Sequence, residues 1–117
     1  MAKIVVYHKP TCSTSRKVIK AISEKGIDFD KINYYETPFT KIKLNDLLKR
    51  MKMKPSELLR KKDKNYKELD FKNKNYTEKQ ILDLMIKHPD LIQRPIVQKG
   101  AKVILARPPE TVNDLLN

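Results

Sequence analysis

The sequence is poor in the residues that build disulfide frameworks and metal sites. It has a single cysteine, Cys12, two histidines, His8 and His88, and no tryptophan. A lone cysteine excludes an intramolecular disulfide and a thiolate zinc cluster, and the two histidines lie too far apart in sequence to indicate a metal site. We therefore expect no metal and no bound cofactor. Any redox chemistry at Cys12 needs a thiol supplied by another molecule.

Long hydrophobic runs are also missing. The apolar stretch near the start is too short for a signal peptide and lacks a small-residue cleavage site, and no window reaches the length that crosses a bilayer. We therefore expect a cytoplasmic protein with no membrane partner. With 117 residues the chain fits one compact domain, residues 1–117, which can bury a core without disulfides. We expect this domain to be a monomer.

Acidic residues are the minority charge, and the formal net charge is +12. Such an excess is typical of nucleic-acid binding. Here, however, lysine is spread through nearly every segment, no run of five or more basic residues occurs, and no aromatic-studded strand resembles an RNA-binding signature. We interpret the charge as a lysine-coated surface with no nucleic-acid partner, which speeds the arrival of anionic substrates.

The first third of the chain has the pattern of a strand, a helix and a second strand. Lys3–Tyr7 is short and β-branched, Ser13–Lys25 carries apolar residues at helical spacing before Gly26, and Asp28–Tyr34 alternates in hydrophobicity. A connection of this length predicts a right-handed crossover that joins two parallel strands.

The rest of the chain predicts a block of helices, then a hairpin and a last helix. Thr40–Met51 is expected to form a helix with Thr40 as N-cap and Ile42 on its inward face, and a second helix is expected over Pro55–Arg60. A capping box from Thr77 to Gln80 opens another helix. The remaining expectations are a surface connection with a brief helical turn over 61–75, hairpin strands over 96–97 and 103–106 around Gly100, and a helix over 110–116. The predicted fold class is α/β.

Cys12 lies in a polar turn between the first predicted strand and helix. A thiol has a pKa of about 8.5 and is a weak nucleophile until it ionises. At a helix start, unpaired N–H groups and the macrodipole favour the thiolate, and the same amides bind oxyanions. Ser15 can donate a hydrogen bond to the sulfur or the anion, and His8 can stabilise the thiolate as imidazolium or relay a proton. The alternatives are an inert buried cysteine and a histidine that only hydrogen-bonds at the strand end.

Arginine is scarce in this lysine-rich chain, so its positions are informative. Arg60 ends a predicted helix, while Arg94 and Arg107 stand before prolines at strand boundaries. A guanidinium holds an oxyanion through two donors, whereas an ammonium acts as a point charge. We expect these three arginines to bind the anion, although each taken singly also fits a surface role, as expected for Arg50.

Five sequence blocks resemble, in the same order, those of the glutaredoxin-type bacterial arsenate reductases. The blocks are YHKPTCSTSR, YYETP, LLRKKD, HPDLIQRPIV and ARPPE, and they extend over almost the whole chain. The resemblance implies a thioredoxin-like fold, with a mixed four-stranded sheet and a helical insertion. The matching functional positions are Cys12 as the nucleophile, His8 and Ser15 beside it, Arg60, Arg94 and Arg107 as anion ligands, and Pro95 as a cis-proline.

The resemblance also implies a mechanism. The thiolate displaces hydroxide or water from arsenate to give a thio-arsenate ester, glutathione then attacks, and glutaredoxin resolves the mixed disulfide as arsenite leaves. A chain with one cysteine requires such external thiols, so the resemblance and the composition agree on glutathione and glutaredoxin as partners.

Two alternatives stay open at this point. Spx-type regulators share the fold, bind RNA polymerase and sense oxidation, but they typically carry a C-x-x-C pair, whereas here Cys12 is followed by three hydroxyl residues, Ser13 to Ser15. A related thiol-transfer oxidoreductase with another substrate fits the same residues.

Overall fold

The computed structural model describes residues 3–116, and the chain divides into two compact units. The first unit is made of residues up to Thr37 together with residues from Arg94 onward, and the second is Pro38–Gln93. The second unit therefore interrupts the sequence of the first, which is the helical insertion that the sequence predicted. The expectation of a single domain over 1–117 stays a prediction.

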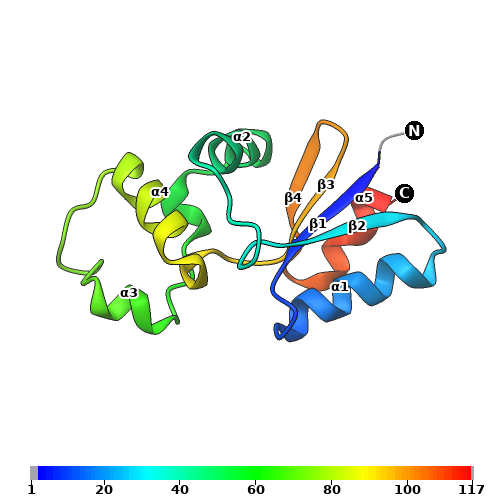
Figure 1. The fold of residues 1–117 in the computed structure, drawn as a ribbon, viewed down its shortest axis with the longest axis horizontal. Helices are drawn as coiled ribbons and strands as arrows, with labels where there is room; N and C mark the ends of the chain where they lie inside the picture. The colour runs from blue at the N-terminus through cyan, green and yellow to red at the C-terminus, as the bar shows by residue number, and fades with distance from the viewer. Residues whose placement is uncertain (1–2, 117) are drawn as a thin grey trace. The chain divides into compact units, whose positions relative to one another are not determined.

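The first unit contains a four-stranded mixed sheet (Figure 1). Its strands are β1 (Ile4–His8), β2 (Phe29–Asn33), β3 (Ile96–Lys99) and β4 (Lys102–Leu105), in the spatial order β2-β1-β3-β4. The β1 and β2 strands are parallel, whereas β3 is antiparallel to both β1 and β4. This topology confirms the predicted α/β class, the crossover after the first strand, the late hairpin and the thioredoxin-like sheet.

One face of the sheet is covered by α1 (Ser13–Glu24) and α5 (Val112–Leu116). Alternate residues of β1 point to this face, and helical spacing brings apolar side chains of α1 against them. The buried core here is formed by Ile4, Val6, Val18, Ile22, Val97, Ala106, Val112 and Leu115. After α1, Gly26 adopts φ +68°, a left-handed conformation that a residue without a Cβ takes at little cost.

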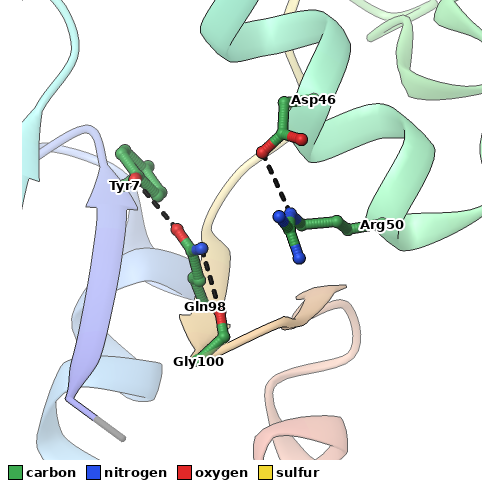
Figure 2. Close-up of polar contacts among 5 residues, drawn as sticks. All are labelled: Tyr7, Asp46, Arg50, Gln98 and Gly100. Atoms are coloured by element: carbon green, nitrogen blue, oxygen red, sulfur yellow. Dashed lines mark hydrogen bonds and ion pairs between the residues drawn. The ribbon is translucent and has the colours of Figure 1, made fainter.

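A short polar chain links β1 to the β3–β4 hairpin. The Tyr7 hydroxyl donates to Gln98 Oε1 at 3.2 Å, and Gln98 Nε2 donates to the Gly100 carbonyl at 3.0 Å (Figure 2). Gly100 has φ +60°, which suits the tight turn between the two strands. The hairpin predicted around Gly100 is therefore confirmed, and Gln98 ties its turn to the central strand.

The strand register brings four chain segments to one end of the sheet, where β1, β2 and β4 end and β3 starts. His8 at the end of β1 pairs with Asn33 at the end of β2, and Ile96 at the start of β3 pairs with both Tyr7 and Leu105. Parallel strands end together, and an antiparallel strand starts where its neighbour ends. Four segments therefore meet at this end of the sheet: those after β1, β2 and β4 and the one before β3. Cys12, the tyrosines after β2, Arg94 and Arg107 all lie on these segments.

The second unit, Pro38–Gln93, is built from short helices. They are α2 (Lys41–Met51), η1 (Pro55–Leu58), α3 (Lys64–Glu68), α4 (Glu78–Lys87) and η2 (Pro89–Leu91). The Thr40 hydroxyl accepts a hydrogen bond from the Lys43 N–H, and Thr77 forms the predicted capping box with Gln80. On α2, the exposed Arg50 pairs with Asp46 at 3.0 Å, one turn away (Figure 2).

Two details of the predicted helices were wrong. Ile42 was expected to face inward, yet its side chain is 84% exposed; at about 100° per residue it lies opposite the stripe formed by Leu44 and Leu47. The second helix ends at Leu58, not at Arg60, because Leu59 is extended and pairs with Ile92.

The segment 61–75 was expected to be a surface connection with a brief helical turn, and α3 confirms that turn. The segment also contributes to an aromatic cluster. Tyr66 and Phe71 stack with ring centroids 5.1 Å apart, and Phe71 lies 4.9 Å from Tyr76, whose hydroxyl donates to the Leu69 carbonyl at 2.7 Å. These rings line an open cavity of about 430 Å³.

The helices within residues 3–116 lack the combination of length and apolar character that a membrane-spanning helix needs.

Candidate active site

Cys12 is the N-cap residue of α1. It has extended backbone angles, its carbonyl accepts from the Arg16 N–H at 3.1 Å, and its own N–H donates to the Lys9 carbonyl at 3.0 Å. The first turn of α1 contains no acidic residue. The sulfur therefore stands where unpaired amides and the positive end of the helix dipole favour an anion, as the sequence predicted.

The surroundings of Cys12 lower the pKa of its thiol to about 7. Burial alone raises this pKa, but the backbone N–H of Ser15, the Arg94 guanidinium, the Ser15 hydroxyl and the Thr14 N–H together outweigh burial. The Cys12 side chain makes no cap hydrogen bond to the start of α1. These donors therefore act mainly on the thiolate, because hydrogen bonds to a charged acceptor are stronger than those to a neutral one.

Ser15 presents a buried hydroxyl whose only available acceptor among the described residues is the Cys12 sulfur. The side chain is fully buried, and its hydroxyl makes no hydrogen bond of full geometry with the described residues. Leaving such a group unpaired costs free energy of folding. The Cys12 thiolate is the acceptor this hydroxyl stabilises.

Arg94 is a buried cation without a carboxylate partner among residues 3–116. Only 5% of it is exposed, its Nη1 donates to the Tyr35 hydroxyl at 3.5 Å, and its Nε has no hydrogen-bond partner in the described part of the chain. Burial lowers the pKa of Arg94, but Tyr34, Cys12 and Tyr35 raise it by more. A buried charge is stable only when paired, so this guanidinium has donors available for an anion.

Arg107 lies at the same end of the sheet and is hydrogen-bonded to the segment that carries Arg94. Its Nη1 donates to the Arg94 carbonyl at 3.0 Å, and the Ala106 N–H donates to the Pro95 carbonyl at 3.0 Å. The Arg94–Pro95 peptide bond is cis, the isomer implied by the resemblance, and the Arg107–Pro108 bond is cis as well.

Arg60 belongs to the helical unit. Its Nη1 donates to the Asp90 carbonyl at 3.2 Å and lies 3.7 Å from the Asp63 carboxylate, and its backbone N–H donates to the Leu91 carbonyl at 2.7 Å. The structure accounts for its place within residues 38–93. Its expected convergence on the anion beside Cys12 stays a prediction.

His8 ends β1 and is buried, with 8% exposure. Burial, together with the charge of Lys31, lowers the pKa of His8. Its Nδ1 has no hydrogen-bond partner among the described residues. This environment disfavours the imidazolium of His8 at neutral pH, and proton relay by the neutral ring stays a prediction.

Sequence reasoning missed the two tyrosines that follow β2. Tyr34 is 1% exposed, its ring centroid lies 5.0 Å from that of Tyr35, and both raise the pKa of Arg94. The signal was present, because residues after two parallel neighbouring strands end up side by side. Only the antiparallel pairing of β3, which is not local in sequence, brings Arg94 to them.

The arrangement is suited to nucleophilic attack on a tetrahedral oxyanion. It combines a thiol half ionised near neutral pH, helix-start amides and a buried guanidinium without a carboxylate. In residues 3–116, no group of three or more His, Cys, Asp or Glu side chains is placed to hold a metal ion.

Comparison with known proteins places these features in a family context. A model of the ArsC family matches residues 7–115. An arsenate reductase of Escherichia coli is 40% identical over 116 residues, which cover 99% of this chain and 82% of that protein. The protein named "Uncharacterized protein YfgD" of Escherichia coli strain K12 is 36% identical over 115 residues, 97% of each chain. Among solved structures, an arsenate reductase from Vibrio cholerae matches with a TM-score of 0.90 at 32% identity, over 97% of both chains.

Proposed function

The chain belongs to the ArsC family, and from that premise we propose that it reduces arsenate to arsenite with Cys12 as the nucleophile. One observation carries the proposal. A thiol whose pKa is lowered to about 7 interacts with a buried arginine that has no carboxylate partner in residues 3–116. Arsenate is a tetrahedral oxyanion and supplies both the electrophile for the sulfur and the negative charge for the guanidinium.

The first proposed step is formation of a thio-arsenate ester. The Cys12 sulfur bonds to arsenic, and one arsenate oxygen takes up protons and leaves as water. The amides at the start of α1 and the Arg94 guanidinium hold the remaining oxygens as charge builds on them. Arg107 and Arg60 are proposed as further anion ligands, and neutral His8 as the proton relay.

The second proposed step needs two external thiols, because Cys12 is the only cysteine. A glutathione thiolate attacks the Cys12 sulfur, an S–S bond forms, and the S–As bond breaks with its electron pair left on arsenic. Arsenic is thereby reduced by two electrons and departs as arsenite. Glutaredoxin then regenerates the Cys12 thiol by thiol–disulfide exchange.

Steady-state arsenate reduction with glutathione and glutaredoxin tests this proposal. Wild type is expected to turn over, Cys12→Ser to be inactive, and Arg94→Lys to raise KM by about tenfold or more, because the ammonium keeps the charge but loses the two-donor fork. Arg50→Lys is the matched control, since Arg50 pairs with Asp46 on α2. Absence of wild-type turnover with any thiol system would contradict the proposal.

A second candidate is a related thiol-transfer oxidoreductase of the same family whose substrate is not arsenate. The name of YfgD, which matches over 97% of both chains, states no activity, so membership of the family does not by itself fix the substrate. This candidate predicts that the Cys12 thiolate is as reactive as proposed above while arsenate turnover is absent.

A further inference from the structure

We propose that Tyr35 is a positioning residue, which holds Arg94 and the turn that carries Cys12 in the geometry that binds the oxyanion. This inference rests on the proposed function for the identity of the anion, and it adds a residue to which neither the chemistry above nor the family comparison gives a role. Tyr35 contacts the site through two parts of its side chain, the hydroxyl and the ring.

The hydroxyl of Tyr35 acts on Arg94. It accepts a hydrogen bond from Arg94 Nη1 at 3.5 Å. Arg94 as a whole is 5% exposed, and its guanidinium has no carboxylate partner in residues 3–116. A planar fork binds an anion well only when its rotation is restricted, and the phenol oxygen supplies an anchor at one corner.

The chemistry of the anchor matters because it is uncharged. A carboxylate in the place of the Tyr35 hydroxyl would form an ion pair with Arg94 and cancel the positive charge that attracts an anion. A neutral phenol orients the fork and leaves the charge in place. Nε of Arg94 is buried and has no partner among the described residues, so the phenol leaves at least one donor of the fork unpaired.

The ring of Tyr35 acts on the Cys12 turn. The Lys9 ammonium lies over this ring, 5.0 Å from its centroid, a cation–π arrangement. The Lys9 carbonyl accepts from the Cys12 N–H at 3.0 Å, so Lys9 closes the turn that presents the sulfur. The Tyr35 side chain therefore contacts both Arg94 and the turn that carries Cys12, and we place the anion between these two groups.

Tyr35 itself is fixed by the end of β2. Its backbone N–H donates to Asn33 Oδ1 at 3.0 Å, and the Asn33 carbonyl accepts from the N–H groups of Glu36 and Thr37. The ring also packs at 5.0 Å from that of the buried Tyr34. A side chain held by a strand end and a buried neighbour is rigid enough to position others.

Protection of Cys12 from alkylation tests this role without depending on turnover. The rate of reaction with iodoacetamide is measured at neutral pH against increasing sulfate, and separately against arsenate, for wild type, Tyr35→Phe and Tyr35→Leu. Tyr35→Phe is expected to raise the half-protecting concentration of both anions by about twofold to tenfold, because one long hydrogen bond is lost. Tyr35→Leu, which also loses the ring under Lys9, is expected to raise it further.

Tyr76→Phe is the matched control, since it removes the same atom from a tyrosine whose hydroxyl donates to the Leu69 carbonyl in the helical unit. Thermal unfolding of all variants separates weaker anion binding from loss of fold. Equal protection in wild type and Tyr35→Phe, or no protection of wild type by either anion, overturns the inference. Weaker sulfate protection in Tyr35→Phe, with no arsenate turnover in wild type, upholds the positioning role and removes only the proposed substrate.

Discussion

At the scale of single residues, the Ser15 hydroxyl lowers the stability of the fold and makes the Cys12 thiol more reactive. This buried hydroxyl lacks a fully formed hydrogen bond in the described chain, yet it lowers the pKa of Cys12. Below about pH 7, where Cys12 is protonated, Ser15→Ala is therefore expected to raise the free energy of unfolding by about 1 kcal/mol, because an unsatisfied polar group is removed. The same change is expected to raise the pKa of Cys12.

Denaturant unfolding and the pH profile of alkylation measure these two effects. Ser13→Ala, at the exposed first residue of α1 and two residues before Ser15, is the control. A Ser15→Ala protein that is both less stable and equally reactive would show that the hydroxyl has a structural role only.

His8 makes a prediction about acid stability. Burial lowers its pKa in the folded protein, so the unfolded chain takes up a proton first as the pH falls below about 6.5. Protonation of His8 therefore favours unfolding, and stability is expected to decline as the pH falls through and below that value. In His8→Gln this part of the decline should be smaller, as measured by thermal unfolding between neutral and mildly acidic pH. His88→Gln removes the other histidine as a control, and identical slopes in wild type and His8→Gln would contradict the account.

Residue types and local spacing were enough to predict Cys12, Ser15, Arg94 and Arg107 as site candidates. The motif placed the cysteine at a helix start, and the prolines marked the arginines at strand ends. Tyr35 was not predicted, because its contact with Arg94 joins positions 59 residues apart. The lowered pKa of His8 could not be predicted from the sequence either, since it depends on how deeply the end of β1 is buried.

At the scale of elements, the capping box of α4 makes a local and testable contribution. The Thr77 hydroxyl accepts from the Gln80 N–H at 3.2 Å, and Gln80 Oε1 accepts from the Thr77 N–H at 2.9 Å. Thr77→Ala is expected to lower the free energy of unfolding by about 1 kcal/mol. The Gln80 N–H loses its acceptor, and the reciprocal bond from the N–H of residue 77 to the Gln80 side chain is weakened. Thr77→Ser keeps the acceptor and should cost much less in the same denaturant titration. Equal losses in both variants would point to packing of the threonine methyl group.

The elements that the sequence predicted well are those whose signals are local. Caps at Thr40 and Thr77, helical spacing in α1 and the turn at Gly100 all act within a few residues. The second helix was predicted too long because pairing of Leu59 with Ile92 competes with helix continuation, and such pairing between distant segments leaves no local signal. The aromatic cluster of Tyr66, Phe71 and Tyr76 lies within one short segment, but its five-residue spacing follows neither the helical nor the strand period, so the pattern did not indicate it.

At the scale of the whole molecule, the net charge of +12 predicts faster attack by anionic reagents. Alkylation of Cys12 by the anion iodoacetate should slow as salt rises, because screening shortens the reach of the field to about 10 Å at 0.1 M. Alkylation by neutral iodoacetamide at the same pH should change little and serves as the control. Parallel salt dependences for the two reagents would mean that the lysine-rich surface does not steer anions to the site.

The pH dependence of Cys12 alkylation by iodoacetamide, in the absence of any anion, tests the central claim most directly. Reactivity is predicted to rise with a midpoint of about 7 in wild type and with a higher midpoint in Arg94→Ala, because a donor to the thiolate is lost. A midpoint near about 8.5, the value of an ordinary cysteine, in both proteins would contradict the claim that this turn and Arg94 create a nucleophilic thiolate.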